Sequence, residues 1–441
     1  MIEFSVAEHI YPIIKSDFMN RKEWLKQSGL LAAGSMAVPS ILSTISSENP
    51  SDIMVVSGWQ MVNIGDVAHT PGLIHLLRSY LPDVNITLWA QDVDLVKEQI
   101  LKANFPNLKI VYGGLNEEGL PEDENVLNAI SQSRILIHGS GPGIIGRERV
   151  QAWRRLTDKP YGIFGVTIGN VWPELKDIIE NAAFLFTRET NSFKVLESAG
   201  VTNPEIHFAP DATFMLNIRN DASASRYMNL NNLEDRKFIC VVPRSRYTPY
   251  HRIHDYLRWD KEHINYVIEE NLRYAEEDHE KMRVAIIRWV RETGHKVVLC
   301  PEMEYQTELF EPYLYNPLPD DVKCHVEMHP YWMPDDAASL YSHAAAVISA
   351  EAHSPIISLV NGTPAFYLRQ PSDTIKGQMY YDLKLDDWVF EIEETTGEDV
   401  ADRLMEVYNN YERSLETVGE LNNRVRHIYD ESMEIVEKLI F

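Results

Sequence analysis

The 441-residue sequence has few cysteines and few positive charges, and it lacks long apolar runs. Its three cysteines, Cys240, Cys300 and Cys324, are far apart and none belongs to a C-x-x-C pair. This spacing excludes a zinc motif and a dense disulfide framework. All three lie in or beside apolar runs, so we expect them to be buried as small hydrophobic side chains.

The shortage of positive charge excludes whole classes of partner. The chain has 41 Lys and Arg residues against 66 Asp and Glu residues, which gives a formal net charge of −25. Nucleic-acid phosphates require a basic surface, and anionic membranes require basic clusters. Neither partner is therefore predicted, and any anionic ligand would have to be bound by a few individual arginines.

Residues 19–37 have the order of an export signal. Met19 is followed by basic residues that include Lys22, by a short apolar stretch and by the small-x-small end Ser35–Ala37. The segment resembles a twin-arginine signal with Lys22 in place of the second arginine, and its apolar part is too short for a transmembrane span. It predicts an exported, periplasmic protein that starts at Met19. If it is instead an ordinary amphipathic helix, the protein is cytoplasmic. Residues 1–51 are accordingly interpreted as a signal-like segment and linker.

From residue 52 onward, short apolar runs alternate with helix-like stretches such as Ala68–Leu81. Runs that are apolar throughout are typical of parallel strands covered by helices on both faces. The predicted strands of this first series are Ile53–Ser57, Ile86–Ala90, Leu108–Tyr112, Arg134–His138, Tyr161–Val166 and Phe184–Thr187.

A polar break at residues 217–236 separates this series from a second one. The second series contains a long polar helix around residues 261–293 and ends in an acidic tail of helical period from Glu391. It also predicts helices over Asp335–His343 and Ser354–Val360. Its predicted strands are Phe238–Val242, Lys296–Leu299, Val322–Val326, Ala346–Ser349 and Ala365–Leu368.

The predicted fold class is α/β, with two Rossmann-like lobes and parallel sheets. The lobes are expected over residues 52–230 and 231–390, and a C-terminal helix or helix pair over residues 391–441. Ligands of open parallel sheets bind beyond the carboxyl ends of the strands. Candidate site residues are therefore those that follow strands.

The first candidate segment opens the first helix of the first lobe. Asp66 either caps this helix or lines the cleft together with Asn63. Gly65 would allow close approach of the backbone.

Further candidates follow later strands of the first lobe. The turn Gly139-Ser140-Gly141 is either a plain tight turn or a set of N–H groups that face an anion. Arg188 is either an anion ligand or a partner of Glu189 in an ion pair, and Asp211 either caps a helix or lines the cleft. The turn belongs to a G-x-G-x-x-G match, but it follows the fourth strand and no acid ends the next strand. We therefore do not predict a dinucleotide cofactor.

The second lobe contributes candidates after two of its strands. Arg244 and Arg246 follow the first strand, and Glu351, His353 and Ser354 follow the strand Ala346–Ser349. A histidine at a strand-to-helix junction is well placed for general acid or base catalysis, because its ordinary pKa lies near operating pH. No function is predicted for the remaining histidines.

Taken in order, these segments resemble the polysaccharide pyruvyl transferase family over about residues 52–370. The resembling pieces are Asn63–Asp66, residues 139–143, Gly165–Gly169, Thr187–Glu189 with Ser192 and Gly200, Ala209–Asp211, and Ser349-x-x-x-His353 followed by Asn361–Pro364.

The resemblance implies a GT-B-like fold and the transfer of a pyruvyl group from phosphoenolpyruvate to a sugar of a cell-surface glycan, as a ketal. It implies a glycan or lipid-linked saccharide acceptor, phosphoenolpyruvate as co-substrate, and no metal or other cofactor. His353 would protonate the donor, with Glu351 and Asp66 as further catalytic candidates. The implied substrate-binding residues are Asn63, Gly65, Gly139, Ser140, Gly141, Arg188, Arg244, Arg246 and Ser354.

Two positions depart from the family pattern. Glu351 stands where the family has an arginine, and Ser140 replaces the middle glycine of the family's turn. A carboxylate in place of a cation beside an anionic donor reverses the local field, by about several kcal/mol at roughly 4 Å. An exported enzyme would also lack phosphoenolpyruvate, which is a cytoplasmic metabolite. Two alternatives therefore stay open: a group transferase with a different donor, and a non-catalytic exported glycan-binding protein.

Overall fold

Seven parallel strands form the first of two sheets in the computed structural model, which describes residues 52–441 apart from 58–59 and 255–256. The predictions made for residues 1–51, including the signal-like segment, lie outside the described residues. The strand order is β3-β2-β1-β4-β5-β6-β7, and β1 pairs with β4 in register Val55 to Ile137. The strands are β1 (Ile53–Val56), β2 (Ile86–Ala90), β3 (Lys109–Tyr112), β4 (Ile135–His138), β5 (Tyr161–Val166), β6 (Phe184–Thr187) and β7 (Ile206–Phe208).

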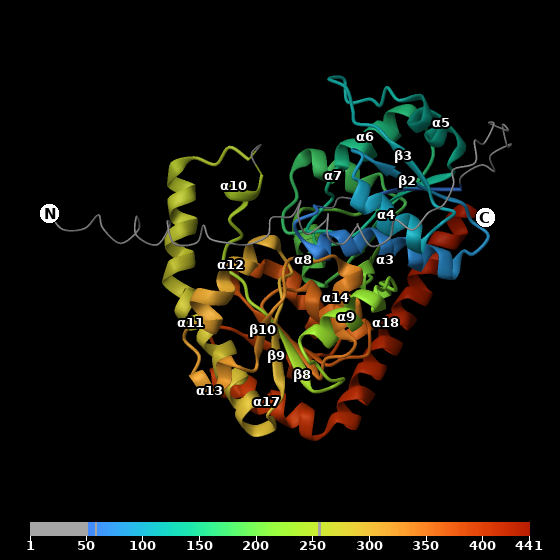
Figure 1. Cartoon of the computed structure of the whole chain (residues 1–441). Helices are drawn as coiled ribbons and strands as arrows, with labels where there is room; N and C mark the ends of the chain where they lie inside the picture. Colours follow the sequence, from blue (N-terminus) through green and yellow to red (C-terminus); the bar gives the residue numbers. More distant parts are fainter. Residues whose placement is uncertain (1–51, 58–59, 255–256) are drawn as a thin grey trace. The chain divides into compact units, whose positions relative to one another are not determined.

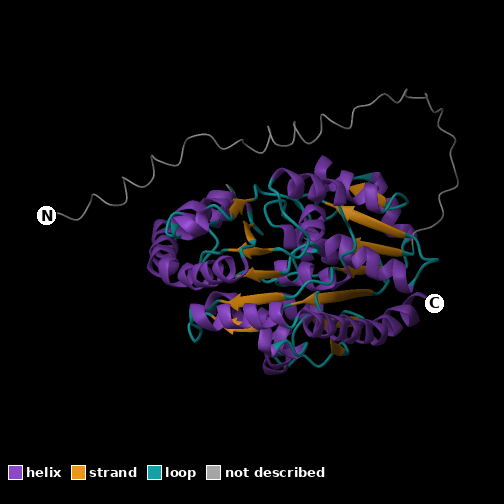
Figure 2. Ribbon diagram, turned by 60° about the horizontal axis from the view of Figure 1, so that its bottom comes forward, coloured by secondary structure: helices purple, strands orange, loops and turns teal. Residues whose placement is uncertain are grey.

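Three of the six helices that connect these strands begin at polar caps. Asn63, Asp94 and Asp123 each accept hydrogen bonds from backbone N–H groups at the start of a helix, which satisfies donors that the first turn leaves without partners. Figure 2 shows helices on either side of the strands. The helices are α3 (Ile64–Tyr80), α4 (Leu95–Asn104), α5 (Glu124–Gln132), α6 (Arg147–Leu156), α7 (Pro173–Glu180) and α8 (Asn191–Ser198).

Six parallel strands form the second sheet, in the order β10-β9-β8-β11-β12-β13. Its central strands are rich in Val and Ile and are buried throughout, as expected for strands that are covered on both faces. The strands are β8 (Phe238–Val242), β9 (Lys296–Leu299), β10 (Val326–Met328), β11 (Ala346–Ser349), β12 (Ala365–Arg369) and β13 (Val389–Glu391).

Helices and short turns of helix surround the second sheet (Figure 1). The longest, α11 (Lys261–Thr293), begins at the cap Asp260 and ends at Gly294 in the left-handed conformation. The others are α9 (Asp221–Leu230), α10 (Tyr250–Ile253), α12 (Thr307–Leu309), α13 (Asp320–Lys323), α14 (Pro334–Tyr341), α15 (His353–Val360) and α16 (Gln378–Asp382). The 3-10 and π turns are η1 (Ala212–Met215), η2 (Glu304–Gln306), η3 (Phe310–Tyr315), η4 (Pro371–Gly377) and η5 (Asp386–Trp388).

Two helices close the chain, α17 (Gly397–Asn409) and α18 (Tyr411–Ile440). α17 packs along α11, whereas α18 contacts elements of both sheets. The guanidinium of Arg134, next to β4, donates to the carbonyl of Ile440 at 3.1 Å. The amide of Asn422 donates to the carbonyl of Leu359 in α15 at 3.0 Å. The predicted C-terminal helical segment is therefore confirmed, and it consists of two helices.

The α/β class with two parallel sheets is confirmed, and ten of the eleven predicted strands have the observed bounds to within one residue at each end. The predicted strand Val322–Val326 is wrong, because Pro319 and two aspartates start the short helix α13 and the strand β10 begins at Val326. Strands β7 and β13, each of three residues, were not predicted. Cys324 is exposed at the end of α13, whereas the other two cysteines are buried as expected.

The predicted lobe boundaries remain predictions, although each sheet lies almost entirely within its expected range. β13 ends at Glu391, one residue beyond the expected end of the second lobe. Within the described part of the chain, no helix combines the length and the apolar character needed to cross a membrane.

Candidate active site

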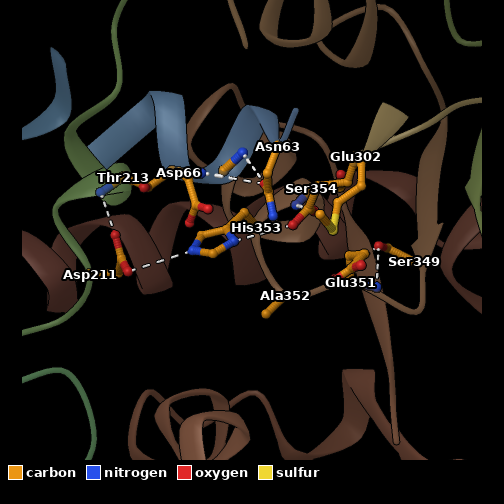
Figure 3. A network of polar contacts seen from close by, with 12 residues as sticks. Asn63, Asp66, Asp211, Thr213, Glu302, Ser349, Glu351, Ala352, His353 and Ser354 are labelled. Atoms are coloured by element: carbon orange, nitrogen blue, oxygen red, sulfur yellow. Dashed lines mark hydrogen bonds and ion pairs between the residues drawn. The ribbon is translucent and has the colours of Figure 1, made fainter. Parts of the chain in front are cut away.

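Residues from four distant segments converge between the two sheets. His353 is the first residue of α15, directly beyond β11, and Glu302 lies beyond the end of β9. Asp211 follows β7, and His69 lies in the second turn of α3. These four side chains are all buried, and three of them can be followed in Figure 3. The positions of Asp211, Glu302 and His353 agree with the rule that sites form at the carboxyl ends of parallel strands.

His353 stands at the centre of this group. Its Nδ1 lies 3.2 Å from Oε1 of Glu302, and its Nε2 lies 3.0 Å from Nε2 of His69 and 3.7 Å from Oδ2 of Asp211. Burial disfavours the charged ring, but the interactions with Asp211 and Glu302 outweigh it and raise the pKa of His353 to about 9. At neutral pH the ring therefore carries a proton between two carboxylates.

Asp211 anchors the first-sheet side of the group. Its Oδ2 accepts from Arg188 at 2.7 Å and lies 3.2 Å from Nε2 of His69, and its Oδ1 accepts from the backbone N–H of Thr213 at 3.0 Å. Burial would raise the pKa of Asp211, but these neighbours and His353 hold it well below its usual range. Asp211 thus both caps η1 and lines the site, the two roles that the sequence left open.

Arg188 lies in the site as predicted, but its charge is already paired. Only 3 % of the residue is exposed. Its Nε donates to Oγ1 of Thr167 at 2.8 Å and its Nη1 to Asp211. The neighbouring Glu189 binds the N-terminus of α8 through Ser192 instead of Arg188. Arg188 therefore fixes the orientation of Asp211, and its charge is balanced by that carboxylate.

Glu302 anchors the second-sheet side of the group. Its Oε2 accepts from the backbone N–H of Ser354 at 2.6 Å, at the N-terminus of α15, where a negative charge is favourable. Burial would raise the pKa of Glu302, but His353 and this helix terminus lower it. The hydroxyl of Ser354, a predicted substrate ligand, accepts instead from Tyr341 at 3.3 Å.

The start of α3 packs against His353. Asn63 is the helix cap, accepting from the N–H of Gly65 at 2.8 Å, so Asp66 is not the cap. Asp66 accepts from Gln60 at 2.6 Å. A Cβ atom on Gly65 would overlap the imidazole of His353, so only glycine permits this approach. The predicted closeness of Gly65 to the site therefore matches the structure.

The turn Gly139-Ser140-Gly141 supports the backbone of the site. Oγ of Ser140 accepts from the N–H of Ala212 at 3.0 Å, and the carbonyl of Gly141 accepts from Thr167 at 3.1 Å. A Cβ on Gly165, whose φ is +66°, would overlap the Ser140 hydroxyl. These contacts favour the tight-turn interpretation, in which the turn positions the Asp211 loop.

Glu351 and Arg244 form a second buried group next to the first. Nε of Arg244 lies 3.3 Å from Oε1 of Glu351, and Nη1 of Arg244 pairs with Asp373. The amide of Gln306 donates to the same Oε1 of Glu351 at 2.7 Å. Burial raises the pKa of Glu351 to about 7, although Arg244 opposes this shift. The carboxylate that departs from the family pattern thus faces the predicted anion-binding arginine.

Comparison with known families shows which family the chain belongs to. The sequence model described as polysaccharide pyruvyl transferase matches residues 63–371, which is well over half of the chain. The chain belongs to the polysaccharide pyruvyl transferase family. The match begins at the α3 cap and ends just beyond β12, so it includes every residue of the buried group around His353. The expected transferase class is thereby confirmed.

Solved structures with the same architecture support the GT-B-like fold of this family member. The UDP-GlcNAc 2-epimerase of Neisseria meningitidis, bound to UDP-GlcNAc, has a TM-score of 0.53 at 11% identity and covers 88% of this chain and 100% of its own. HepE of Anabaena, in complex with UDP and glucose, has a TM-score of 0.53 at 9% identity with the same coverage. A UDP-glucosyltransferase of Polygonum tinctorium has a TM-score of 0.50 at 9% identity and covers 89% and 100%. At these identities the likeness shows the fold alone. No curated protein matches the sequence.

Arg246, which the family resemblance placed among the substrate ligands, is bound elsewhere. Its guanidinium donates to both carboxylate oxygens of Asp278 at 2.7 and 2.8 Å and to Glu393 at 2.6 Å, and it stacks on the ring of Tyr274. None of its described contacts reaches the group around His353. Arg246 therefore joins α11 to the segment after β13, and a role in binding substrate has no support in these contacts.

Three atoms of the group around His353 could in principle bind a metal ion. Nε2 of His69, Nε2 of His353 and Oδ2 of Asp211 lie within 4.8 Å of one another, and both residue types ligate transition metals. However, Arg188 already donates to that carboxylate oxygen, and the raised pKa of His353 favours the protonated ring, which cannot be a ligand. Charge therefore opposes a cation here, and the expectation of no metal or other cofactor remains a prediction.

Sequence reasoning missed two residues of the site, His69 and Glu302. Glu302 lies three residues beyond β9, so the rule that selected Arg188 and Glu351 could have selected it. His69 lies inside a helix of otherwise largely apolar residues. A histidine in such a helix is a weak signal of function, because many buried histidines are simply part of a protein core.

Proposed function

We propose that the protein transfers a pyruvyl group from phosphoenolpyruvate to two hydroxyls of a sugar in a cell-surface glycan, forming a ketal. The observation that carries this proposal is the position of His353 between Asp211 and Glu302. A ring that keeps its proton at neutral pH can deliver it to a substrate carbon. The family match supports the class of reaction.

His353, the sugar hydroxyls and the leaving phosphate together supply and accept every proton of the proposed reaction. His353 gives its proton to C3 of phosphoenolpyruvate, and one sugar hydroxyl adds to C2. The second hydroxyl then displaces phosphate by forming a second C2–O bond as the C2–O bond to phosphate breaks. Of the two hydroxyl protons, one returns to the His353 ring and the other leaves with inorganic phosphate. Because His69 lies 3.0 Å from His353, a proton can pass between the two rings. Asp66 and Glu351 remain predicted catalytic residues.

The acceptor and the place of action are part of the same proposal. A glycan or lipid-linked saccharide supplies the hydroxyl pair, as the family description suggests. Because phosphoenolpyruvate is a cytoplasmic metabolite, transfer would take place in the cytoplasm. N-terminal sequencing of the native protein tests this point. A start near Val38 would indicate a processed and exported protein and would contradict the proposed place of action.

The donor is tested by calorimetry with phosphoenolpyruvate, and the reaction by release of inorganic phosphate with methyl glycosides as acceptors. We expect binding at millimolar donor or below, and a ketal methyl signal by NMR. The variant His353→Asn keeps a donor toward Glu302 but no acidic proton, so transfer should fall by about 10²–10⁴-fold. His427→Asn, at an exposed histidine, is the matched control. Absence of binding at millimolar donor would overturn phosphoenolpyruvate as the donor.

One observation favours a second candidate, a transferase with a less anionic donor. Both predicted anion-binding arginines of the site are already paired with carboxylates, Arg188 with Asp211 and Arg244 with Glu351 and Asp373. A donor with fewer negative charges would not compete with these pairs. Binding of such a donor, with none of phosphoenolpyruvate, would favour this alternative.

A further inference from the structure

Arg244 is a buried cation that already forms ion pairs with two carboxylates. Only 8 % of the residue is exposed. Its Nη1 pairs with Asp373, which also binds Lys376 at 2.9 Å, and its Nε lies 3.3 Å from Glu351. The Nε–H makes no well-aligned hydrogen bond with any described residue, so the contact with Glu351 is electrostatic. Arg244 is therefore held by one strong partner and one replaceable partner.

Glu351 is the replaceable partner because its surroundings support both of its protonation states. The amide of Gln306 donates to Oε1, and Arg244 and Lys376 favour the carboxylate. The carboxylates of Glu302 and Asp373 and complete burial favour the neutral acid. The titratable or charged groups that face Glu351 are Arg244 (beyond β8), Tyr250 (α10), Glu302 (beyond β9), Tyr305 (η2), and Asp373 and Lys376 (η4).

An anion that binds Arg244 must therefore come close to the carboxyl group of Glu351. If Glu351 stays ionised, a third negative group would have to join Glu351 and Asp373 beside the buried Arg244. If Glu351 is protonated, its O–H can donate to the incoming anion, and Arg244 is free to pair with it. The arrangement couples the arrival of an anion at Arg244 to the charge on Glu351.

We propose that the anionic donor of this site binds together with one proton, which Glu351 takes up as a phosphate or carboxylate group of the donor replaces it beside Arg244. This inference rests on the proposed function only in naming phosphoenolpyruvate as the donor. Glu351 thereby selects for conditions in which a proton is available. The family's arginine, which carries a fixed positive charge, would impose no such requirement.

The coupling predicts a pH dependence with a defined sign. Above about pH 7 the free protein holds Glu351 increasingly ionised, so donor affinity falls by up to about tenfold for each further pH unit. Between about pH 7 and pH 8.5 the wild-type affinity should drop by roughly tenfold to thirtyfold. The Glu351→Gln variant retains an acceptor for Gln306 and carries no charge. It should bind more tightly at pH 8.5 and show a nearly flat profile over this range.

The decisive measurement is calorimetry of phosphoenolpyruvate and of inorganic phosphate in two buffers that differ in heat of ionisation, at about pH 8. Wild-type protein should take up about one proton per donor bound, and Glu351→Gln about none. Glu351→Asp, which keeps the charge on a shorter side chain, should retain most of the uptake. Circular dichroism checks the fold of each variant, and the wild-type proton count is informative without any variant.

The outcomes separate this inference from the proposed function. Equal pH dependence and equal proton uptake in wild-type and Glu351→Gln proteins would overturn the inference, and so would weaker binding by a folded Glu351→Gln. If only inorganic phosphate binds, with the expected uptake, the inference holds and phosphoenolpyruvate is not the donor. If neither ligand binds either protein at any pH tested, both the inference and the donor assignment are overturned.

Discussion

The ion pairs of His353 should be visible as a pH-dependent part of the protein's stability. The pKa of His353 is about 9 in the folded protein, against an ordinary value of 6.5, and each pKa unit corresponds to about 1.4 kcal/mol. Because the folded pKa is the higher one, the stabilisation is fully present below about pH 6.5 and is lost as the pH rises through 9. The free energy of unfolding should therefore fall by about 3 kcal/mol between about pH 6.5 and 9.5.

Urea unfolding at several pH values in this range measures the effect, with His353→Asn as the test variant. The difference in unfolding free energy between wild type and variant should shrink by about 3 kcal/mol across the range, because the variant has no ring to deprotonate. His427→Asn removes a histidine whose side chain is 75% exposed, and it should follow the wild-type curve. Parallel curves for wild type and His353→Asn would refute the interpretation of His353 as a protonated ring between two carboxylates.

Three further substitutions test other contacts. Gly65→Ala should lower both activity and melting temperature, because the added Cβ would displace His353. Gly114→Ala, at a position with no atom within 4 Å of a Cβ, should lower neither, and equal effects of the two variants would contradict the close approach. Arg246→Met should cost about 3–5 kcal/mol in urea unfolding and leave phosphoenolpyruvate affinity unchanged by calorimetry, and a folded variant with weakened affinity would return Arg246 to the substrate site. Tyr429→Phe removes a hydroxyl that donates to a backbone carbonyl at 2.8 Å and should lower the unfolding free energy by about 1 kcal/mol; no measurable loss would mean that the bond adds nothing.

The sequence predicted the strands of this fold well because parallel strands buried on both faces are apolar throughout. β5 and β11, for example, have the predicted bounds. The error at Val322–Val326 arose because this strand-like segment directly follows a proline and two aspartates. There the helix-start signals outweighed β-propensity. Strands of three residues, such as β7, are too short to carry a pattern.

The sequence predicted only part of the site. The rule of strand ends found Arg188, Glu351 and His353, because that rule depends on topology, which the pattern of strands reveals. It could not say which charge pairs with which, because the partners Asp211 and Arg244 come from other parts of the chain. Sequence alone therefore named arginines that could bind an anion, and only the structure placed carboxylates against them.

Helix α18 connects the elements on the two sides of the site. The hydroxyl of Tyr429 donates to the carbonyl of Asp211 at 2.8 Å, and Asn422 on the same helix holds the far end of α15, whose first residue is His353. Gly65, by contrast, meets His353 through close packing without a hydrogen bond between them. The segment around Gly65 is nevertheless bonded to the second sheet's side of the site, because the N–H of Ile64 donates to the carbonyl of Glu302 at 3.0 Å. α18 and the start of α3 therefore connect the elements that carry Asp211 and His353 at two separate places, and any change in the spacing of these two residues would have to break hydrogen bonds at one of them.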